Sequence, residues 1–510
     1  MARGDARTDV ELVEDDDGTT GAPPGGGRPP GGAAAHGGDD PTGASHRTRR
    51  RVLVLGAALV AVLLAVGVVG QAVVASRERA RIEAVAGLPG VVDALDGPVR
   101  VLRSGADDGF LRASARTPDG FLVASRQGED GAASVRAFDP ADGTVAWEVE
   151  LIAPRDVLEP LPGGEVVRSG GWCVEYGSDG DLLVCLADDG VSVVGRGTLT
   201  QVAPTTTRLL VLDAHDGSVV SDLSAAVGES LSSMSGAVLD DLVVLAGADG
   251  SAVHVRAITV DGSVEWEATF PTTTTTAYGS YAEVHATTDG VAVVTADALM
   301  LLDASGATVQ GHQMTSDSFV RGTAGDAVLV LAQDDETTLV VRPDGVRSLP
   351  GRWVTLAVDD GSAPGLLLTS DTSGLHAWDL DGGPLWSSEQ PVNQQDAVLL
   401  DGRVIAGYAT ELFALDAGTG AERWRAGGLL PDATVATDGR HVLAMAPSPG
   451  GSAPQVLVAL DATGGGVAWR VTLPDEVTAL RPTHGVLAAY RFDRFDGSTG
   501  DAGPVVTVLG

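Results

Sequence analysis

Short runs of alternating apolar and polar residues, separated by Gly-containing turns, recur from about Leu111 to the C-terminus. Strict alternation predicts β-strands that bury one face. The segment 401–426, DGRVIAGYATELFALDAGTGAERWRA, reads as a Gly turn, a strand, a turn, a second strand, an Asp-to-Gly turn and a final strand. The pattern therefore predicts repeated units that consist only of strands.

One Gly marks the last turn of each unit, and successive marker glycines lie 37–45 residues apart, with one gap of 74. The marker glycines are Gly143, Gly217, Gly262, Gly306, Gly345, Gly382, Gly420 and Gly465. All-strand units of this length are typical of propeller blades. We predict eight blades of four strands, or nine if the end segments GPVRVLR and PVVTVLG pair to complete another unit and close the ring.

The residues of the last turn have separate structural roles. The Asp that opens it can accept hydrogen bonds from turn amides, as expected for Asp139, Asp416 and Asp461, and Gly143, Gly420 and Gly465 can adopt φ > 0. A Trp that stands four residues after this Gly can bury its ring between blades while its indole N–H donates a hydrogen bond to an acceptor. Five units have this Trp: Trp147, Trp266, Trp386, Trp424 and Trp469. Ser221, Gln310 and Leu349 replace it in degenerate units.

The repeat is clearest in LFALDAGTGAERW, LVALDATGGGVAW, VRAFDPADGTVAW and LHAWDLDGGPLW. This phrase resembles the repeat of the PQQ-like (pyrroloquinoline quinone-like) β-propeller family, and the resemblance covers nearly everything after Leu111. It implies an all-β propeller in which the repeated Trp is a structural docking residue.

The N-terminal part has a different composition. Residues 1–46 carry Gly/Pro/Ala runs and almost no large apolar residue, which predicts a disordered cytoplasmic tail. Residues 47–76 hold a basic flank and 24 uncharged residues, long enough as a helix of about 36 Å to cross a bilayer once. Residues 77–92 read as a helical juxtamembrane stalk, and residues 93–510 as the propeller ectodomain. Val73-Val74-Ala75 leaves signal-peptide cleavage as an alternative.

The two cysteines bear on orientation, because the Arg clusters on the two sides of the span differ little. Cys173 and Cys185 flank the turn signal GSDGD, and folding back on it brings them together across a hairpin. Such a pair suggests a disulfide in an oxidising compartment, with two reduced buried thiols as the alternative. A disulfide puts the propeller outside the cytoplasm. We also expect this hairpin to be the insertion that explains the gap of 74.

Composition narrows the function classes. A formal net charge of −36 argues against nucleic-acid binding, and the absence of Lys excludes Schiff-base chemistry. No catalytic, cofactor-binding or metal motif stands in the sequence, and we expect no cofactor. His254 and His376 are interpreted as strand or turn residues rather than catalytic bases. Asp493, Asp496 and Asp501 lie near a Gly turn, but their spacing does not match a calcium loop.

Three function classes remain. The first is a non-enzymatic binding or scaffold module, anchored in a bacterial cell membrane, which meets an envelope protein or small ligand through its loops or central face. The second is an extracellular sensor that signals through the single helix. The third, implied by the resemblance, is a PQQ- and calcium-dependent quinoprotein dehydrogenase. The third is disfavoured because many alcohol-oxidising members have adjacent cysteines, whereas these are twelve residues apart.

Overall fold

The computed structural model describes residues 76, 79–107, 109–128, 131–154, 165–168, 171–177, 180–195, 198–202, 204–228, 231–249, 251–272, 282–315, 318–332, 336–392, 397–430, 435–447, 455–474, 477–491 and 505–510. These residues belong to one compact unit, Val74–Gly510. The predicted tail and the predicted membrane span lie outside the described residues. Within the described part, no helix is long and apolar enough to cross a membrane.

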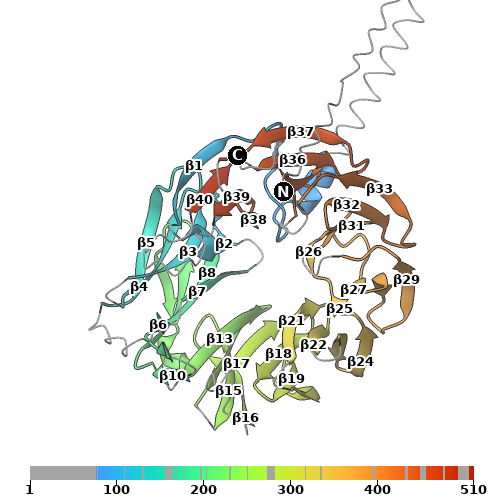
Figure 1. The fold of residues 1–510 in the computed structure, drawn as a ribbon. Helices are drawn as coiled ribbons and strands as arrows, with labels where there is room; N and C mark the ends of the chain where they lie inside the picture. Colours follow the sequence, from blue (N-terminus) through green and yellow to red (C-terminus); the bar gives the residue numbers. More distant parts are fainter. Residues whose placement is uncertain are drawn as a thin grey trace, which may run out of the picture. The chain divides into compact units, whose positions relative to one another are not determined.

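Nine blades surround the centre of this unit, with the strands of most blades in chain order from the inside outwards (Figure 1). Blade 1 contains β2 (Ala113–Arg116), β3 (Leu122–Gln127), β4 (Ala133–Phe138) and β5 (Val145–Ile152). Blade 2 contains β7 (Trp172–Tyr176), β8 (Leu182–Asp188), β11 (Thr207–Asp213) and β12 (Val219–Asp222). Blade 3 contains β13 (Ser232–Leu239), β14 (Leu242–Ala248), β15 (Ala252–Thr259) and β16 (Val264–Pro271). Blade 4 contains β17 (Ala282–Ala286), β18 (Gly290–Thr295), β19 (Ala298–Asp303) and β20 (Thr308–Gln313).

The ring continues through the second half of the chain. Blade 5 contains β21 (Ser318–Ala324), β22 (Ala327–Ala332), β23 (Thr337–Arg342) and β24 (Gly345–Pro350). Blade 6 contains β25 (Arg352–Trp353), β27 (Leu367–Asp371), β28 (Gly374–Trp378) and β29 (Pro384–Ser388). Blade 7 contains β30 (Ala397–Leu400), β31 (Arg403–Tyr408), β32 (Glu411–Asp416) and β33 (Glu422–Gly427), with β26 (Leu356–Asp359) added in parallel to β30. Blade 8 contains β34 (Ala436–Thr437), β35 (His441–Ala446), β36 (Val456–Asp461) and β37 (Val467–Thr472).

Blade 9 closes the ring and corrects the predicted count of eight. It contains β38 (Ala479–Thr483), β39 (Val486–Arg491), β40 (Val505–Leu509) and, as its outermost strand, β1 (Val101–Ala106) from the other end of the chain. The pairing of β1 with β40 is antiparallel, as the end segments predicted. Counting turn glycines gives eight because the third and fourth strands of blade 9 are not joined by a turn.

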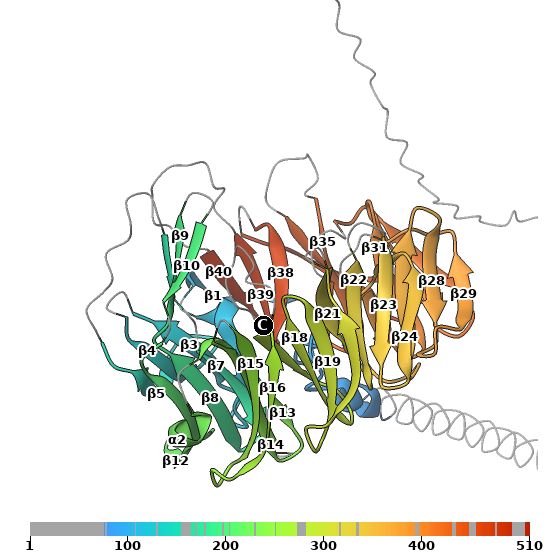
Figure 2. The ribbon, with the colours of Figure 1, turned by 90° about the horizontal axis from the view of Figure 1, so that it is seen from below.

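The long gap between Gly143 and Gly217 also has a different cause from the one predicted. The cysteine hairpin is the regular first pair of strands of blade 2, β7 and β8. The extra residues instead form a separate three-stranded sheet of β6 (Glu165–Arg168), β9 (Val191–Gly195) and β10 (Thr198–Val202). Figure 2 shows β9 and β10 extending beyond the blades on one face of the ring. Sequence spacing locates an insertion within a unit but not which of its strands are the additional ones.

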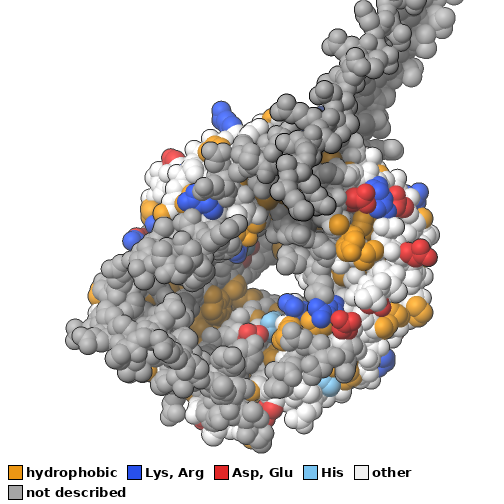
Figure 3. Space-filling model, viewed as in Figure 1, with side chains coloured by type: hydrophobic (Ala, Val, Ile, Leu, Met, Phe, Trp, Pro, Cys, Tyr) orange, Lys and Arg blue, Asp and Glu red, His pale blue; other side chains and the backbone are white. Residues whose placement is uncertain are grey.

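Apolar side chains fill the spaces between neighbouring blades. The second strands have nearly continuous buried runs, as in β14, because both of their faces are covered. The outermost strands alternate exposed and buried residues, as in β33. The middle of the ring is hollowed, with hydrophobic and charged side chains on its wall (Figure 3). On the inner strand β21, the Arg321 guanidinium lies 4.8 Å from the centre of the Phe319 ring.

The described part of the predicted stalk packs onto the ring. Residues 79–85 are helical, and Val85 and Val91 are buried in the core shared by blades 7 and 8. A Cβ at Gly439, which has φ +82°, would lie 2.6 Å from Val85, so this close approach requires glycine. Two backbone amides that follow this segment also bind the ring. The amide of Val92 donates to Thr437 O, and the amide of Asp93 donates to Gly485 O.

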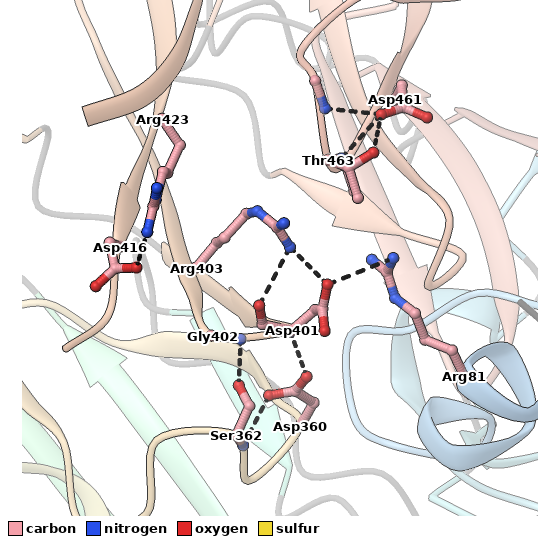
Figure 4. A network of polar contacts seen from close by, with 12 residues as sticks. Arg81, Asp360, Ser362, Asp401, Gly402, Arg403, Asp416, Arg423, Asp461 and Thr463 are labelled. Carbon is pink, nitrogen blue, oxygen red and sulfur yellow. Dashed lines mark hydrogen bonds and ion pairs between the residues drawn. The ribbon is translucent and has the colours of Figure 1, made fainter. Parts of the chain in front are cut away.

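Polar contacts fix the helical segment beside blade 7 (Figure 4). Asp401 Oδ2 lies 3.7 Å from Arg81 Nη1 and 2.6 Å from Arg403 Nη1. The backbone amide of Asp401 donates to Asp360 Oδ2 at 2.5 Å, and that of Gly402 donates to Ser362 Oγ at 2.8 Å. The helical segment, the connection from β26 to β27 and the turn from β30 to β31 are therefore joined at one place.

A titratable contact joins blades 1 and 2. His215 Nδ1 lies 2.7 Å from Asp119 Oδ2 across the two exposed turns. The hydrogen bond with Asp119 and the charges of Asp119, Asp213 and Asp181 raise the pKa of His215 above its usual value. Because the folded pKa exceeds the unfolded one, the contact stabilises fully below about pH 6.5 and its contribution is lost as pH rises through the folded pKa. NMR titration of labelled histidines should show a raised pKa for His215 that falls in Asp119→Asn; an unchanged pKa would contradict the contact.

Candidate functional site

The repeated Trp residues contact the last turn of the next blade. The indole Nε1 donates to a backbone carbonyl in four cases: Trp147 to Ala214 (3.1 Å), Trp266 to Ala304 (2.9 Å), Trp386 to Ala417 (2.7 Å) and Trp424 to Ala462 (3.1 Å). The acceptor is always the Ala that follows the turn Asp. The same rings cover the marker glycines, since a Cβ at Gly420 or Gly465 would lie within 2.7 Å of the Trp ring beneath it.

Trp469 differs from the other four. It belongs to blade 8 and faces blade 9, where the third and fourth strands come from opposite ends of the chain and no turn supplies an acceptor. Its Nε1 is buried without a hydrogen-bond partner among the described residues. The ring packs instead in the core of blades 8 and 9, 6.2 Å from the His441 ring.

The Asp and Gly residues of these turns have the local geometry that the turn requires. Asp139 Oδ1 accepts from the amide of Ala141 at 2.7 Å, and Asp461 Oδ1 accepts from the amides of Thr463 and Gly464. Asp416 accepts from the Thr419 hydroxyl at 2.8 Å. Positive φ angles of 80°, 70° and 69° occur at Gly143, Gly420 and Gly465.

Cys173 and Cys185 form a disulfide. They are direct partners on the antiparallel strands β7 and β8, with Cα atoms 4.1 Å apart. Both are buried, at 2% and 0% exposure, in the core between blades 1 and 2. Among the described residues no group of acids, histidines or cysteines has the geometry of a metal site. Asp493, Asp496 and Asp501 lie outside the described residues.

A pocket of about 350 Å³ lies on blade 3, where α2 (Ser224–Val227) connects β12 to that blade. Its floor is apolar and consists of Val227, Leu231, Met234 and Leu245. Val227 and Leu245 also pack into the core shared by blades 2 and 3. The strands of its polar wall, β15 and β16, are labelled at the lower edge of the ring in Figure 1. The lining of the pocket comes from all four strands of blade 3 and from α2.

Two side-chain contacts form the polar wall of the pocket. Asp249 Oδ2 lies 2.9 Å from His254 Nε2, and Arg256 Nη2 lies 2.6 Å from Glu267 Oε1. Arg256 Nη1 also donates to Ala226 O at 2.6 Å, which fixes α2 against blade 3. Hydrogen bonds from His254, and from the turn of Ser251 and Ala252, hold the pKa of Asp249 well below its usual range.

The wall also places a hydroxyl next to the histidine. Thr269 Oγ1 lies 3.4 Å from His254 Nδ1, so Asp249, His254 and Thr269 form a row of consecutive side-chain contacts. Blade 6 repeats this arrangement, since His376 contacts Asp371 at 3.1 Å and Ser387 Oγ at 3.0 Å. There, hydrogen bonds from Ser373 and His376 lower the pKa of Asp371 to about 2. The arrangement thus occurs in two blades, with His254 on β15 and His376 on β28, next to the turns that precede these strands.

The pocket was not predicted from the sequence. One part of its wall has a sequence motif, because DGSAVH at 249–254 and DTSGLH at 371–376 share Asp, Ser and His at the same spacing. That motif locates the Asp–His pairs on the turns between second and third strands. Arg256 and Glu267 come from different strands, and only their cross-strand register brings them together.

These features define a β-propeller of the PQQ-like repeat class, with nine blades among the described residues. The chain belongs to the family described as outer membrane protein assembly factor BamB, whose model matches residues 131–345 and 410–502, more than half of the chain. The match confirms the family resemblance of the repeated phrase.

Solved structures with a similar arrangement come from proteins of different function. BamB from Moraxella catarrhalis is 17% identical, and the match covers 81% of this chain and 99% of that one, with a TM-score of 0.39. The quinohemoprotein alcohol dehydrogenase from Comamonas testosteroni is 12% identical, with 82% and 78% covered and a TM-score of 0.38. No curated protein matches the chain. At these identities the likeness concerns the fold alone.

Proposed function

We propose that the protein is a membrane-anchored, non-enzymatic propeller that binds an envelope protein or small ligand on the extracytoplasmic side of a bacterial cell. The observation that carries this proposal is the pocket on blade 3. Its acidic and basic groups are paired with one another, so that they shape a preformed wall instead of leaving a reactive group unpartnered. Membership of the BamB family supports a binding role.

The proposed location rests on two features of the chain. The uncharged segment before residue 76 is long enough to span a bilayer once. The buried disulfide fits an oxidising compartment. Thiol alkylation of the protein from cells denatured directly in the alkylating reagent, without a reductant, measures the oxidation state. We expect both cysteines to be protected from alkylation until a reductant is added; free thiols would contradict an extracytoplasmic propeller.

Binding through the pocket is tested with two matched variants. Thr269→Trp places a large ring on the pocket wall, whereas Ser387→Trp makes the same change at the corresponding position of blade 6, outside the pocket. The full-length tagged protein is crosslinked in intact cells, and its complexes are recovered from the envelope. We expect a specific adduct with the wild type and with Ser387→Trp that Thr269→Trp loses. Equal recovery with all three proteins, or no adduct with any, would contradict binding through this pocket.

A further inference from the structure

The pocket on blade 3 combines an apolar floor with a wall that holds two carboxylates, Asp249 and Glu267, and one guanidinium, Arg256. We propose that it binds a small organic cation: an apolar group, aromatic or branched aliphatic, that carries one ammonium or guanidinium group. This inference rests on the proposed binding function and names the ligand class of the same site.

The floor sets the apolar half of the ligand. Val227 and Leu245 are buried, and Leu231 and Met234 are half-buried beside them. Met is flexible and polarisable, and therefore adapts to aromatic or aliphatic groups. Gly247 also lines the pocket, and a Cβ there would lie 2.7 Å from Leu231. A cavity of about 350 Å³ accommodates one phenyl or branched alkyl group with a short polar extension.

The donors of the wall are already engaged. Arg256 uses Nη2 on Glu267 and Nη1 on the carbonyl of Ala226. The nitrogens of His254 face Asp249 and Thr269. An anionic ligand would have to displace one of these partners, and the displaced carboxylate would then be left near the anion. The wall is therefore poorly suited to carboxylates and phosphates.

One acceptor of the wall, Glu267, is less fully used. It contacts Arg256 through Oε1, it lines the pocket, and its side chain is 56% exposed. Hydrogen bonds from His254 and from the turn amides hold the pKa of the Asp249 carboxyl low, and they already use both of its oxygens. The wall therefore holds two carboxylates and one guanidinium. The chain's net charge of −36 adds a long-range attraction for cations.

The test is calorimetric titration of the full-length protein in phosphatidylcholine nanodiscs, whose lipid has no net charge. The probes are 2-phenylethylamine, 3-phenylpropionate and 2-phenylethanol, which share the apolar group and differ in the polar one. We expect saturable binding of the amine, and at least about tenfold weaker binding of the other two. Glu267→Gln, at an exposed position, should weaken amine binding by about tenfold. Thr269→Trp should abolish it, and Ser387→Trp should leave it unchanged.

The outcomes separate the ligand class from the function. The carboxylate or the alcohol could bind as tightly as the amine, with Thr269→Trp abolishing the binding of each. That result would overturn the proposed preference for a cation, while binding at the pocket would stand. Amine binding that survives Thr269→Trp lies elsewhere on the protein and overturns the inference. If no probe binds but the envelope adduct forms and depends on Thr269, the ligand class fails and the proposed function remains. If both experiments are negative, both proposals fail.

Discussion

Replacing Trp424 with alanine is expected to lower the free energy of unfolding by about 3–5 kcal/mol, the usual cost of removing a large buried aromatic side chain. The ring is 7% exposed and fills the space between blades 7 and 8. Its Nε1 donates to Ala462 O at 3.1 Å, and its face covers Gly465. Alanine leaves a cavity and a carbonyl without its donor, and both effects destabilise the contact. Denaturant unfolding followed by circular dichroism gives the difference.

Trp469 provides the matched control for this variant. It occupies the same position of the repeat in blade 8, but it is half-buried and its Nε1 has no partner among the described residues. We therefore expect Trp469→Ala to destabilise clearly less than Trp424→Ala. Equal losses for the two variants would mean that the turn of the next blade contributes nothing to docking. An unchanged midpoint for Trp424→Ala would refute the inter-blade role of the repeated Trp.

Removing the disulfide is expected to lower the free energy of unfolding by about 3 kcal/mol, because the link restricts the unfolded chain around a short loop. The two cysteines are 12 residues apart in sequence and join the two inner strands of blade 2. The double variant Cys173→Ala/Cys185→Ala removes the link, and its denaturation midpoint is compared with that of the oxidised protein.

Reduced wild-type protein is the control for the side chains, since it keeps both sulfur atoms in the core without the bond. We expect the reduced protein and the double variant to unfold at similar denaturant concentrations, both below the oxidised protein. If the oxidised and reduced proteins unfold together, the disulfide does not contribute to the stability of the ring.

The sequence was sufficient for the fold class because the turn phrase is local and repeated. Asp416, Gly420 and Trp424 stand within nine residues, and each has a conformational reason to be there. Ring closure could also be predicted from the sequence, because GPVRVLR and PVVTVLG are strand segments that belong to none of the repeated units. The preferred count of eight was wrong, and the alternative of nine was right, for a related reason: blade 9 has no turn between β40 and β1, so no marker glycine exists to be counted.

The pocket depends on relations that sequence does not display. Arg256 and Glu267 meet only because β15 and β16 pair in one register, and α2 supplies the carbonyl of Ala226 from the neighbouring blade. The Asp249–His254 pair is local, and its motif returns in blade 6, so that part is recoverable by comparing units. Likewise, residues 77–92 read as a separate stalk because the burial of Val85 and Val91 comes from blades 7 and 8, which are distant in sequence.

The central claim is that this propeller binds a partner rather than catalysing PQQ-dependent oxidation. The most direct measurement is calorimetric titration of the purified full-length protein with PQQ, in the presence and absence of calcium. We predict no saturable heat of binding from a folded sample under either condition. Saturable, calcium-dependent binding of PQQ would contradict the account and would place the protein among the quinoprotein dehydrogenases.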